Sequence, residues 1–201
     1  MANESLPGPS GPRLAGVDHV AFATWKPVET VNFYRDVMGL RLIHAISAKG
    51  WGRTDHPDFL HFFFDTGQGS TIAFFYYVGT KPREDMAGPR GYLGMARHLA
   101  WIAESEADLL AWHRRLETQG VSVSEVVEHE ALKSIYFRDP NGYPLEITWK
   151  ARTLTAADAE DAALTIAAMI DTFGGGSGER TIEDMWRRKG EKVRAQAAQA
   201  K

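Results

Sequence analysis

Two stretches of alternating apolar and polar residues begin strand-like segments of the same layout. The first reads Val-Asp-His-Val-Ala-Phe from Val17, and the second reads Ala-Arg-His-Leu-Ala-Trp from Ala96. Successive side chains of a strand point to opposite faces, so each large apolar pair shares one face. His19 and His98 therefore occupy the opposite, more polar face of their strands.

An amphipathic stretch closed by a glycine follows each segment. His19 lies 20 residues before Gly39, and His98 lies 22 residues before Gly120. Between them, the positions that recur at helical spacing are Val28, Val31, Tyr34, Val37 and Met38 in the first copy, and Leu109, Leu110, His113 and Leu116 in the second. This spacing predicts one helix after each strand.

The two copies agree again further along the chain. Phe64 to Ala73 and Phe137 to Glu146 are equal steps, each with a glycine at the same offset. Gly-rich and Asp-Pro-Asn-Gly stretches predict hairpin turns. The chain is therefore interpreted as an internal repeat of strand, helix and several strands, with modules at 16–80 and 92–150 and a linker around Gly88–Gly91. The predicted fold class is α+β.

The two ends of the chain lie outside this repeat. Residues 1–15 are rich in Pro and Gly and are expected to be disordered. Residues 151–201 are expected to form a helical extension, in which Thr155 caps a helix that runs to about Phe173. A glycine-rich break then precedes a second helix that starts at Thr181.

Composition narrows the possible functions. The formal net charge is −3, which gives no basic field for nucleic acid. No apolar run is long enough to span a membrane, and the N-terminal segment lacks the apolar core of a signal peptide, so a cytoplasmic location is expected. The chain has no Cys, so a metal site would have to use His and carboxylate ligands.

Alternation in the last predicted strand places Glu146 on the same polar face as the two repeated histidines. Leu145 and Ile147 share the other face, which the helices would cover. A carboxylate in a hollow without a cation would cost several kcal/mol. His19, His98 and Glu146 are therefore polar residues on the faces that the helices would leave uncovered.

These residues resemble the vicinal oxygen chelate superfamily, which includes glyoxalase I, fosfomycin and bleomycin resistance proteins and type I extradiol dioxygenases. The resemblance covers about Gly16 to Lys150. It implies two βαβββ modules whose sheets form a cupped half-barrel around a metal held by His19, His98 and Glu146. The fourth ligand position of the family falls on Ala73, which implies a three-ligand site. Dimers are usual in the family, so a homodimer is expected.

The end of the second module is similar to the extradiol ring-cleavage signature. His129, then Ile135-Tyr136, then Asp139-Pro140-Asn141-Gly142, then Glu146 follow one another at the signature's separations. The resemblance implies an Fe(II) enzyme of aromatic catabolism that cleaves a catechol beside its two hydroxyls with O₂, since two His and one carboxylate leave ligand positions open. Tyr136 would hydrogen-bond a substrate oxygen, and His129 would orient or stabilise the substrate anion.

The sequence departs from this pattern at the acid–base histidine of extradiol enzymes, where it has Ser70 or Thr71. His61 lies one strand earlier on the cup face and is the candidate substitute. Aromatic residues on the same face would suit a flat ligand, and the predicted substrate pocket is Phe63, Phe75 and Tyr77.

Two alternatives stay open. A glyoxalase-like isomerase or lyase, or a thiol transferase, would use Zn²⁺, Ni²⁺ or Mn²⁺ and need no oxygen. A metal-free drug-binding module would bind its ligand independently of any metal, so that His19→Ala would leave the affinity unchanged.

Overall fold

The computed structural model describes residues 14–51, 55–84, 86, 88, 91–174 and 180–199. Most of the predicted disordered segment and part of the predicted linker lie outside these residues. The described chain divides into two compact units, one ending at Arg152 and one beginning at Thr153. The first unit contains both copies of the repeat.

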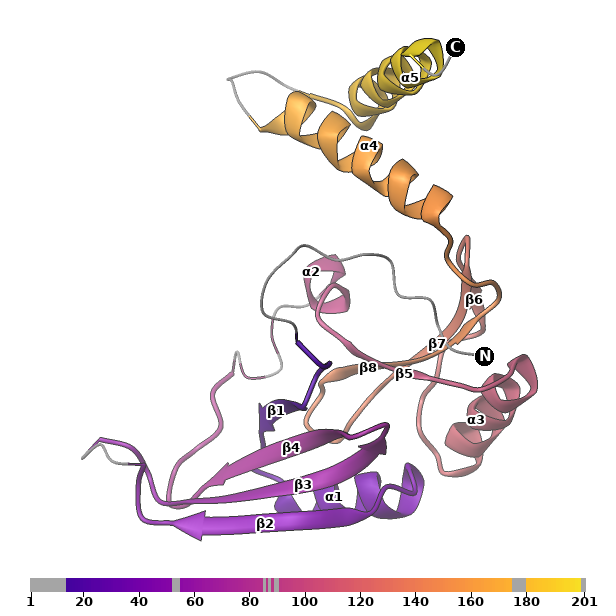
Figure 1. Ribbon diagram of the computed structural model, residues 1–201. Helices are drawn as coiled ribbons and strands as arrows, with labels where there is room; N and C mark the ends of the chain where they lie inside the picture. The colour runs from indigo at the N-terminus through magenta and orange to yellow at the C-terminus, as the bar shows by residue number, and fades with distance from the viewer. Residues whose placement is uncertain are drawn as a thin grey trace. The chain divides into compact units, whose positions relative to one another are not determined.

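The first module follows the order strand, helix, three strands. Its elements are β1 (His19–Ala23), α1 (Pro27–Asn32), the π-helical turn η1 (Phe33–Val37), β2 (Leu42–Ala48), β3 (Phe59–Gly67) and β4 (Ser70–Tyr77). The strands form sheet A in the order β1-β4-β3-β2, with β1 parallel to β4 and the other pairs antiparallel (Figure 1).

The second module repeats this arrangement after a short helix, α2 (Tyr92–Met95). Its elements are β5 (Leu99–Ile102), α3 (Glu106–Thr118), β6 (Val127–Glu128), β7 (Leu132–Arg138) and β8 (Pro144–Lys150). Sheet B has the order β5-β8-β7-β6, and β5 is parallel to β8 as β1 is to β4 in sheet A. The predicted pair of βαβββ modules is confirmed, and both sheets are open.

The strand registers of the two sheets coincide position by position. Ala73 lies opposite Phe63 in sheet A, and Glu146 lies opposite Tyr136 in sheet B. The parallel neighbours also correspond, because Ala21 pairs with Ala73 and Ala100 pairs with Glu146. The nine-residue steps seen in the sequence therefore reflect equivalent places in two copies of one sheet.

The predicted helices form for identifiable local reasons. Ser105 caps α3 by accepting a hydrogen bond from the Asp108 N–H at 3.1 Å, and Glu106 and Asp108 place negative charge in its first turn. Pro27 begins α1, where its missing N–H costs no helical hydrogen bond. Gly39 follows η1 with φ 70°, a conformation that side chains disfavour, so the helical segment ends there.

A single apolar core joins the two modules. Its buried members include Tyr34 of η1, Phe64 and Phe74 of sheet A, and Leu145 and Ile147 of sheet B. α1 with η1 covers one face of sheet A, and α3 covers one face of sheet B (Figure 1). The other face of each sheet, here called the open face, carries the alternate residues, including every candidate site residue placed on a strand.

Polar contacts tie the β7–β8 turn to the first module. The Thr24 hydroxyl donates to Asn141 Oδ1 at 2.7 Å, and the Asn141 amide donates to the Thr30 hydroxyl at 3.0 Å, all three groups being buried. On the outside, Arg115 of α3 donates to the carbonyl oxygens of Val37 and Asp36, at the end of η1. These contacts fix the two modules relative to each other.

The second unit contains α4 (Ala156–Phe173) and α5 (Ile182–Gln199). A capping box at Thr155 starts α4, as the sequence predicts. The two helices pack on each other, and ion pairs join Lys189 to Asp161 at 2.7 Å and Lys192 to Asp171 at 2.6 Å. Within the described residues, no helix is both long and apolar enough to cross a membrane.

Candidate metal and substrate site

His98 and Glu146 meet on the open face of sheet B. His98 immediately precedes β5, and Glu146 lies on the neighbouring strand β8. Their Nε2 and Oε2 atoms are 2.8 Å apart, with side-chain exposures of 33% and 7%. The sequence placed these two residues on one face, and the structure brings them into contact.

A backbone hydrogen bond fixes which nitrogen of His98 is free. His98 Nδ1 lies 2.8 Å from the Met95 carbonyl oxygen, which can only accept a hydrogen bond. Nδ1 therefore carries a proton, and Nε2 is the nitrogen that faces Glu146. Histidines that bind metals usually have their second nitrogen held in this way.

His19 has the same kind of support in the first module. It begins β1, its side chain is 46% exposed, and its Nδ1 lies 2.6 Å from Asp18 Oδ1. The Asp18 carboxylate accepts a hydrogen bond from Nδ1, which leaves Nε2 available as a ligand atom.

The structure does not gather the predicted trio into one cluster. In the part of the chain that the structure describes, no three His, Asp or Glu side chains are arranged to hold a metal ion. The contact between His98 and Glu146 forms a pair, and His19 stands outside it. The assignment of His19 as third ligand therefore stays a prediction.

The paired atoms nevertheless suit a divalent cation. With metal–ligand bonds of about 2.0–2.2 Å, two atoms bound to one ion at right angles lie about 3 Å apart. The 2.8 Å separation of His98 Nε2 and Glu146 Oε2 is close to that value. Imidazole nitrogen and carboxylate oxygen are also ligands that Fe(II) and Mn(II) accept.

Tyr136 and His129 complete the group on sheet B. Tyr136 lies directly opposite Glu146 in the β7–β8 pair, and its hydroxyl is 2.9 Å from His129 Nε2. Burial, and then the negative charge of Glu146, raise the pKa of Tyr136 above its usual 10.0. The phenol is therefore neutral at physiological pH and can donate a hydrogen bond. The ring of His98 stands at 88° to that of Tyr136, with centroids 6.1 Å apart.

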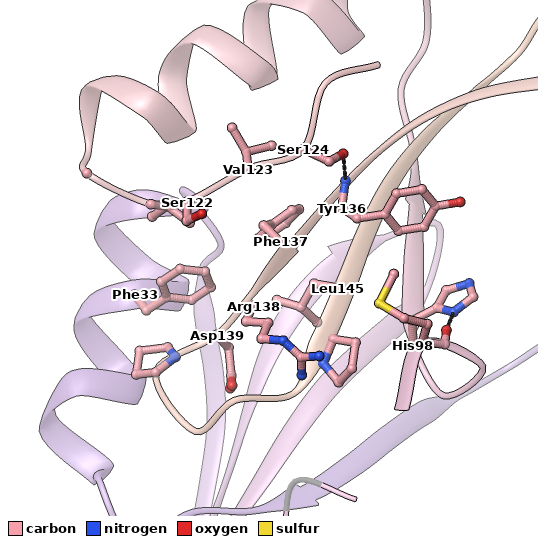
Figure 2. Close-up of a pocket in the computed structure, with 15 residues that line it drawn as sticks. Phe33, His98, Ser122, Val123, Ser124, Tyr136, Phe137, Arg138, Asp139 and Leu145 are labelled. Carbon is pink, nitrogen blue, oxygen red and sulfur yellow. Dashed lines mark hydrogen bonds between the residues drawn. The ribbon is translucent and has the colours of Figure 1, made fainter. Parts of the chain in front are cut away.

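A cavity of about 600 Å³ has His98 and Tyr136 in its lining. Figure 2 shows His98 and Tyr136 on the same side of it, with Phe33 of η1 and Val123 farther along its wall. The Ser124 hydroxyl accepts a hydrogen bond from the Tyr136 backbone N–H at 3.0 Å. This bond ties the loop after α3 to β7.

His61 lies on the open face of sheet A, as alternation predicted. It is 4% exposed, and its Nδ1 is 3.0 Å from the Phe74 carbonyl oxygen, so the proton again sits on Nδ1. Burial lowers the pKa of His61 below 6.5, and the neighbouring His19 and His44 lower it further. The ring is thus a neutral imidazole with a free Nε2, although no contact joins it to Glu146.

The predicted pocket residues also occupy this face of sheet A. The ring of Phe63 lies 4.2 Å from that of His61 and 6.0 Å from that of His19, measured between centroids. Phe75 stacks on His61, and Tyr77 stacks on Phe75. Ala73, fully buried, stands where sheet B has Glu146, so sheet A supplies no second carboxylate at that place.

Sequence reasoning missed three features of the site. The Asp18 carboxylate was readable, because an acid directly before a candidate ligand is a simple signal. The Met95 carbonyl was not predictable, because its hydrogen bond with His98 depends on the path of the chain between α2 and β5. Trp51, in the connection between β2 and β3, belongs to no periodic pattern, yet it stacks on Phe59 of β3.

Comparison with known proteins identifies the family. Residues 16–147 match the Glyoxalase/Bleomycin resistance protein/Dioxygenase superfamily. The chain belongs to this superfamily. The crystal structure of SMU.1112c has 25% sequence identity to this chain and a TM-score of 0.52. The match covers 68% of this chain and 99% of SMU.1112c. A domain of the same superfamily from Frankia sp. EAN1pec has a TM-score of 0.50, at 22% identity, over 69% of this chain and 99% of its own.

The curated relatives of this superfamily member are named as dioxygenases. MhqO of Bacillus subtilis (strain 168), named a ring-cleaving dioxygenase, is 29% identical over 138 residues, which are 67% of this chain and 40% of MhqO. The manganese-dependent 2,3-dihydroxybiphenyl 1,2-dioxygenase of Geobacillus genomosp. 3 is 25% identical over 168 residues, 80% of this chain and 45% of that protein. The chain thus spans less than half the length of these relatives.

Proposed function

We propose that this member of the superfamily is an Fe(II)-dependent extradiol dioxygenase that cleaves a catechol-type diol with O₂. One observation carries the proposal: Glu146 contacts His98 and lies opposite Tyr136, whose hydroxyl contacts His129. Three residues of the ring-cleavage signature, His129, Tyr136 and Glu146, are therefore joined to one another and to His98 at sheet B. The names of the relatives support the same reaction class.

His98, Glu146 and His19 are the proposed ligands. His98 and Glu146 would hold the ion from sheet B, and His19 would approach from β1 with its Nε2 free. The bound ion would supply a template for the two substrate hydroxyls and O₂, and a path for electron density from ring to oxygen. Mn(II) is the alternative, since one relative is named as manganese-dependent.

The protein's own residues would position the diol and handle its protons. Tyr136 holds its proton at neutral pH and would donate a hydrogen bond to a substrate oxygen, which requires His129 Nε2–H to donate to the phenol oxygen. His129 would also help to orient or stabilise the substrate anion. His61 is a neutral imidazole whose Nε2 can accept a proton. Phe63, Phe75 and Tyr77 would contact the aromatic ring.

The glyoxalase-like alternative has less support from the site. The superfamily members of that type usually use four protein ligands, and the equivalent of Glu146 in sheet A is the buried methyl group of Ala73. The metal-free binding alternative leaves the nearly buried carboxylate of Glu146 with no role beyond its contact with His98.

Anaerobic loading with Fe(II), followed by aerobic assay on catechol and 2,3-dihydroxybiphenyl, tests the proposal. We expect oxygen uptake that matches the appearance of a yellow ring-fission product, one O₂ for each ring. Glu146→Gln should abolish both signals, whereas Glu160→Gln on the exposed surface of α4 should leave them unchanged. Iron-loaded protein that consumes no oxygen with either diol would refute the proposal. Oxygen-independent turnover with Zn²⁺ or Ni²⁺ would favour the isomerase instead.

A further inference from the structure

The α4–α5 unit has small side chains between its helices and large apolar side chains on its surface. The two helices pack on each other (Figure 1), and the buried residues described in this unit are Ala168, Thr172 and Met185. Large apolar side chains usually occupy the interior of a folded unit. Here most of them are exposed instead.

The exposed apolar residues of α4 form one stripe. They recur at positions i, i+3, i+4 and i+7, which is the spacing of one face of a helix, and each is between 37% and 55% exposed. The members of this α4 stripe are Ile166, Met169, Ile170 and Phe173. A face of this kind normally packs on a core, so the stripe indicates a packing partner other than α5.

α5 carries a second stripe. Ile182, Trp186 and Val193 lie on one side of the helix, and each is between 44% and 59% exposed. Neither stripe falls within residues 16–147, the part of the chain that matches the superfamily. The apolar surface is therefore a feature of the extension.

The area of the two stripes approaches that of one side of a stable interface. An aromatic side chain offers about 150–250 Å² and an aliphatic one somewhat less, so seven residues at about half exposure leave roughly 600 Å² of apolar surface. A stable interface buries about 800 Å² on each partner, including its polar rim. A stripe pair of this size can hold two chains together.

The charges of the two helices favour a second copy of the same unit as the partner. All four charged residues of α4 are acidic, whereas α5 has five basic and three acidic residues. Ion pairs already join α5 to α4 within one copy, from Lys189 to Asp161 and from Lys192 to Asp171. If α4 of one copy lies along α5 of the other, opposite charges meet again, and two-fold symmetry forms both contacts at once. An acidic α4 is unfavourable at an anionic membrane surface.

We propose that the two stripes form a dimerisation surface, and that its partner is the same surface of a second copy of this chain. α4 of one copy would lie along α5 of the other, so that four helices enclose the stripes. The pairing is independent of the proposed reaction, because it uses no residue of the metal and substrate site.

Sedimentation equilibrium of the full-length protein at micromolar concentration tests this surface. Ile170→Glu on α4 and Trp186→Glu on α5 each place a charge in the contact, so each should halve the molar mass of the wild-type particle. The dissociation constant of the association should rise about 100-fold or more. Ile170→Ala, which adds no charge, should raise it about tenfold.

Val28→Glu is the matched control, because this residue of α1 is 66% exposed and lies in the other unit. It should leave the molar mass unchanged. Circular dichroism should show wild-type helix content in every variant, and Ile170→Ala keeps the test decisive if a glutamate variant loses helix. The inference is overturned if the wild-type protein is a monomer, whether or not it binds lipid vesicles, or if both glutamate variants keep the wild-type mass.

Discussion

At the scale of single residues, the site depends on hydrogen bonds that decide where each proton sits. His19, His98 and His61 each place Nδ1 against an oxygen acceptor, namely the Asp18 carboxylate, the Met95 carbonyl and the Phe74 carbonyl. The Nε2 atoms of His19 and His61 are therefore available to bind a metal or accept a proton, and the Nε2 atom of His98 lies against Glu146. Such hydrogen-bonded neighbours hold a metal-binding imidazole in one orientation.

Tyr136→Phe tests the proposed donor role most simply. The substitution removes the hydroxyl that contacts His129 and keeps the ring opposite Glu146. We expect kcat for ring cleavage to fall about 10²-fold, the usual cost of losing one positioned hydrogen-bond donor. Metal content and thermal stability should stay close to wild type. Unchanged kcat would show that the Tyr136 hydroxyl takes no part in the reaction.

The candidate ligands were predictable because repetition made them conspicuous. His19 and His98 stand at equal places in two copies of one pattern, and strand alternation puts Glu146 on the face of His98. Alternation does not fix the distance between two sheets. For that reason the sequence could pair His98 with Glu146 on sheet B, but could not say how near His19 comes to them.

At the scale of elements, the β7–β8 turn locks the two modules together. Its Asp139-Pro140-Asn141-Gly142 sequence was readable as a hairpin turn, but its contacts with Thr24 and Thr30 join residues more than a hundred positions apart. No local pattern reports such contacts. The π-helical end of the first helix was equally unpredictable, because its residues keep an ordinary amphipathic spacing.

Asn141→Ala should reveal the strength of this lock. It removes a buried amide that bonds with Thr24 and Thr30, and it leaves two buried hydroxyls with fewer partners. Leaving buried polar groups unsatisfied costs about 1–3 kcal/mol, so urea unfolding should show a loss of that size. Asn32→Ala, which removes an exposed amide bonded to Arg35, should cost under about 0.5 kcal/mol. Equal losses in the two variants would contradict the assigned role of the turn.

Tyr143 connects the same region to β1 and predicts an alkaline instability. Its hydroxyl donates to the Ala23 carbonyl at 2.9 Å, and burial, reinforced by the charge of Asp139, raises its pKa from 10.0 to about 12. The folded protein therefore holds this proton more tightly than the unfolded chain. Its contribution to stability is complete below pH 10 and is lost as the pH rises toward 12.

Unfolding midpoints measured between pH 9 and 12 test this prediction. Wild-type protein should lose stability more steeply than Tyr143→Phe, in which the ionising group is absent. Tyrosine absorbance near 295 nm should show at least one group that ionises well above pH 10. Parallel stability curves for the two proteins would contradict the expected shift in the pKa of Tyr143.

At the scale of the whole molecule, the repeat explains both the fold and the asymmetry of the site. Two equivalent sheets present His19 and His98 at one place, but Ala73 and Glu146 at the other. The first sheet carries aromatic residues instead, and Phe63 occupies the position that Tyr136 occupies in the second sheet. The two modules thus share one framework. They differ in their side chains, which are polar on the open face of sheet B and aromatic on that of sheet A.

The α4–α5 unit should be separable from the repeat. All the residues of the main core cluster lie between Phe33 and Ile147, within the first compact unit. A chain ending at Arg152 should therefore unfold cooperatively, with a melting temperature within about 5 °C of the full chain. Calorimetry measures this directly. A shortened chain that shows no cooperative transition would mean that α4 and α5 are required for the fold of the first unit.

Metal stoichiometry tests the central claim most directly. Full-length protein incubated anaerobically with Fe(II) or Mn(II), then desalted, should retain one ion per chain by elemental analysis. His98→Ala and Glu146→Ala should each reduce retention to background, and His19→Ala should lower it at least tenfold. His56→Ala, at a partly buried histidine that is not a proposed ligand, offers a control with retention unchanged. Wild-type protein that retains no ion, or variants at His98 and Glu146 that retain a full equivalent, would contradict the account.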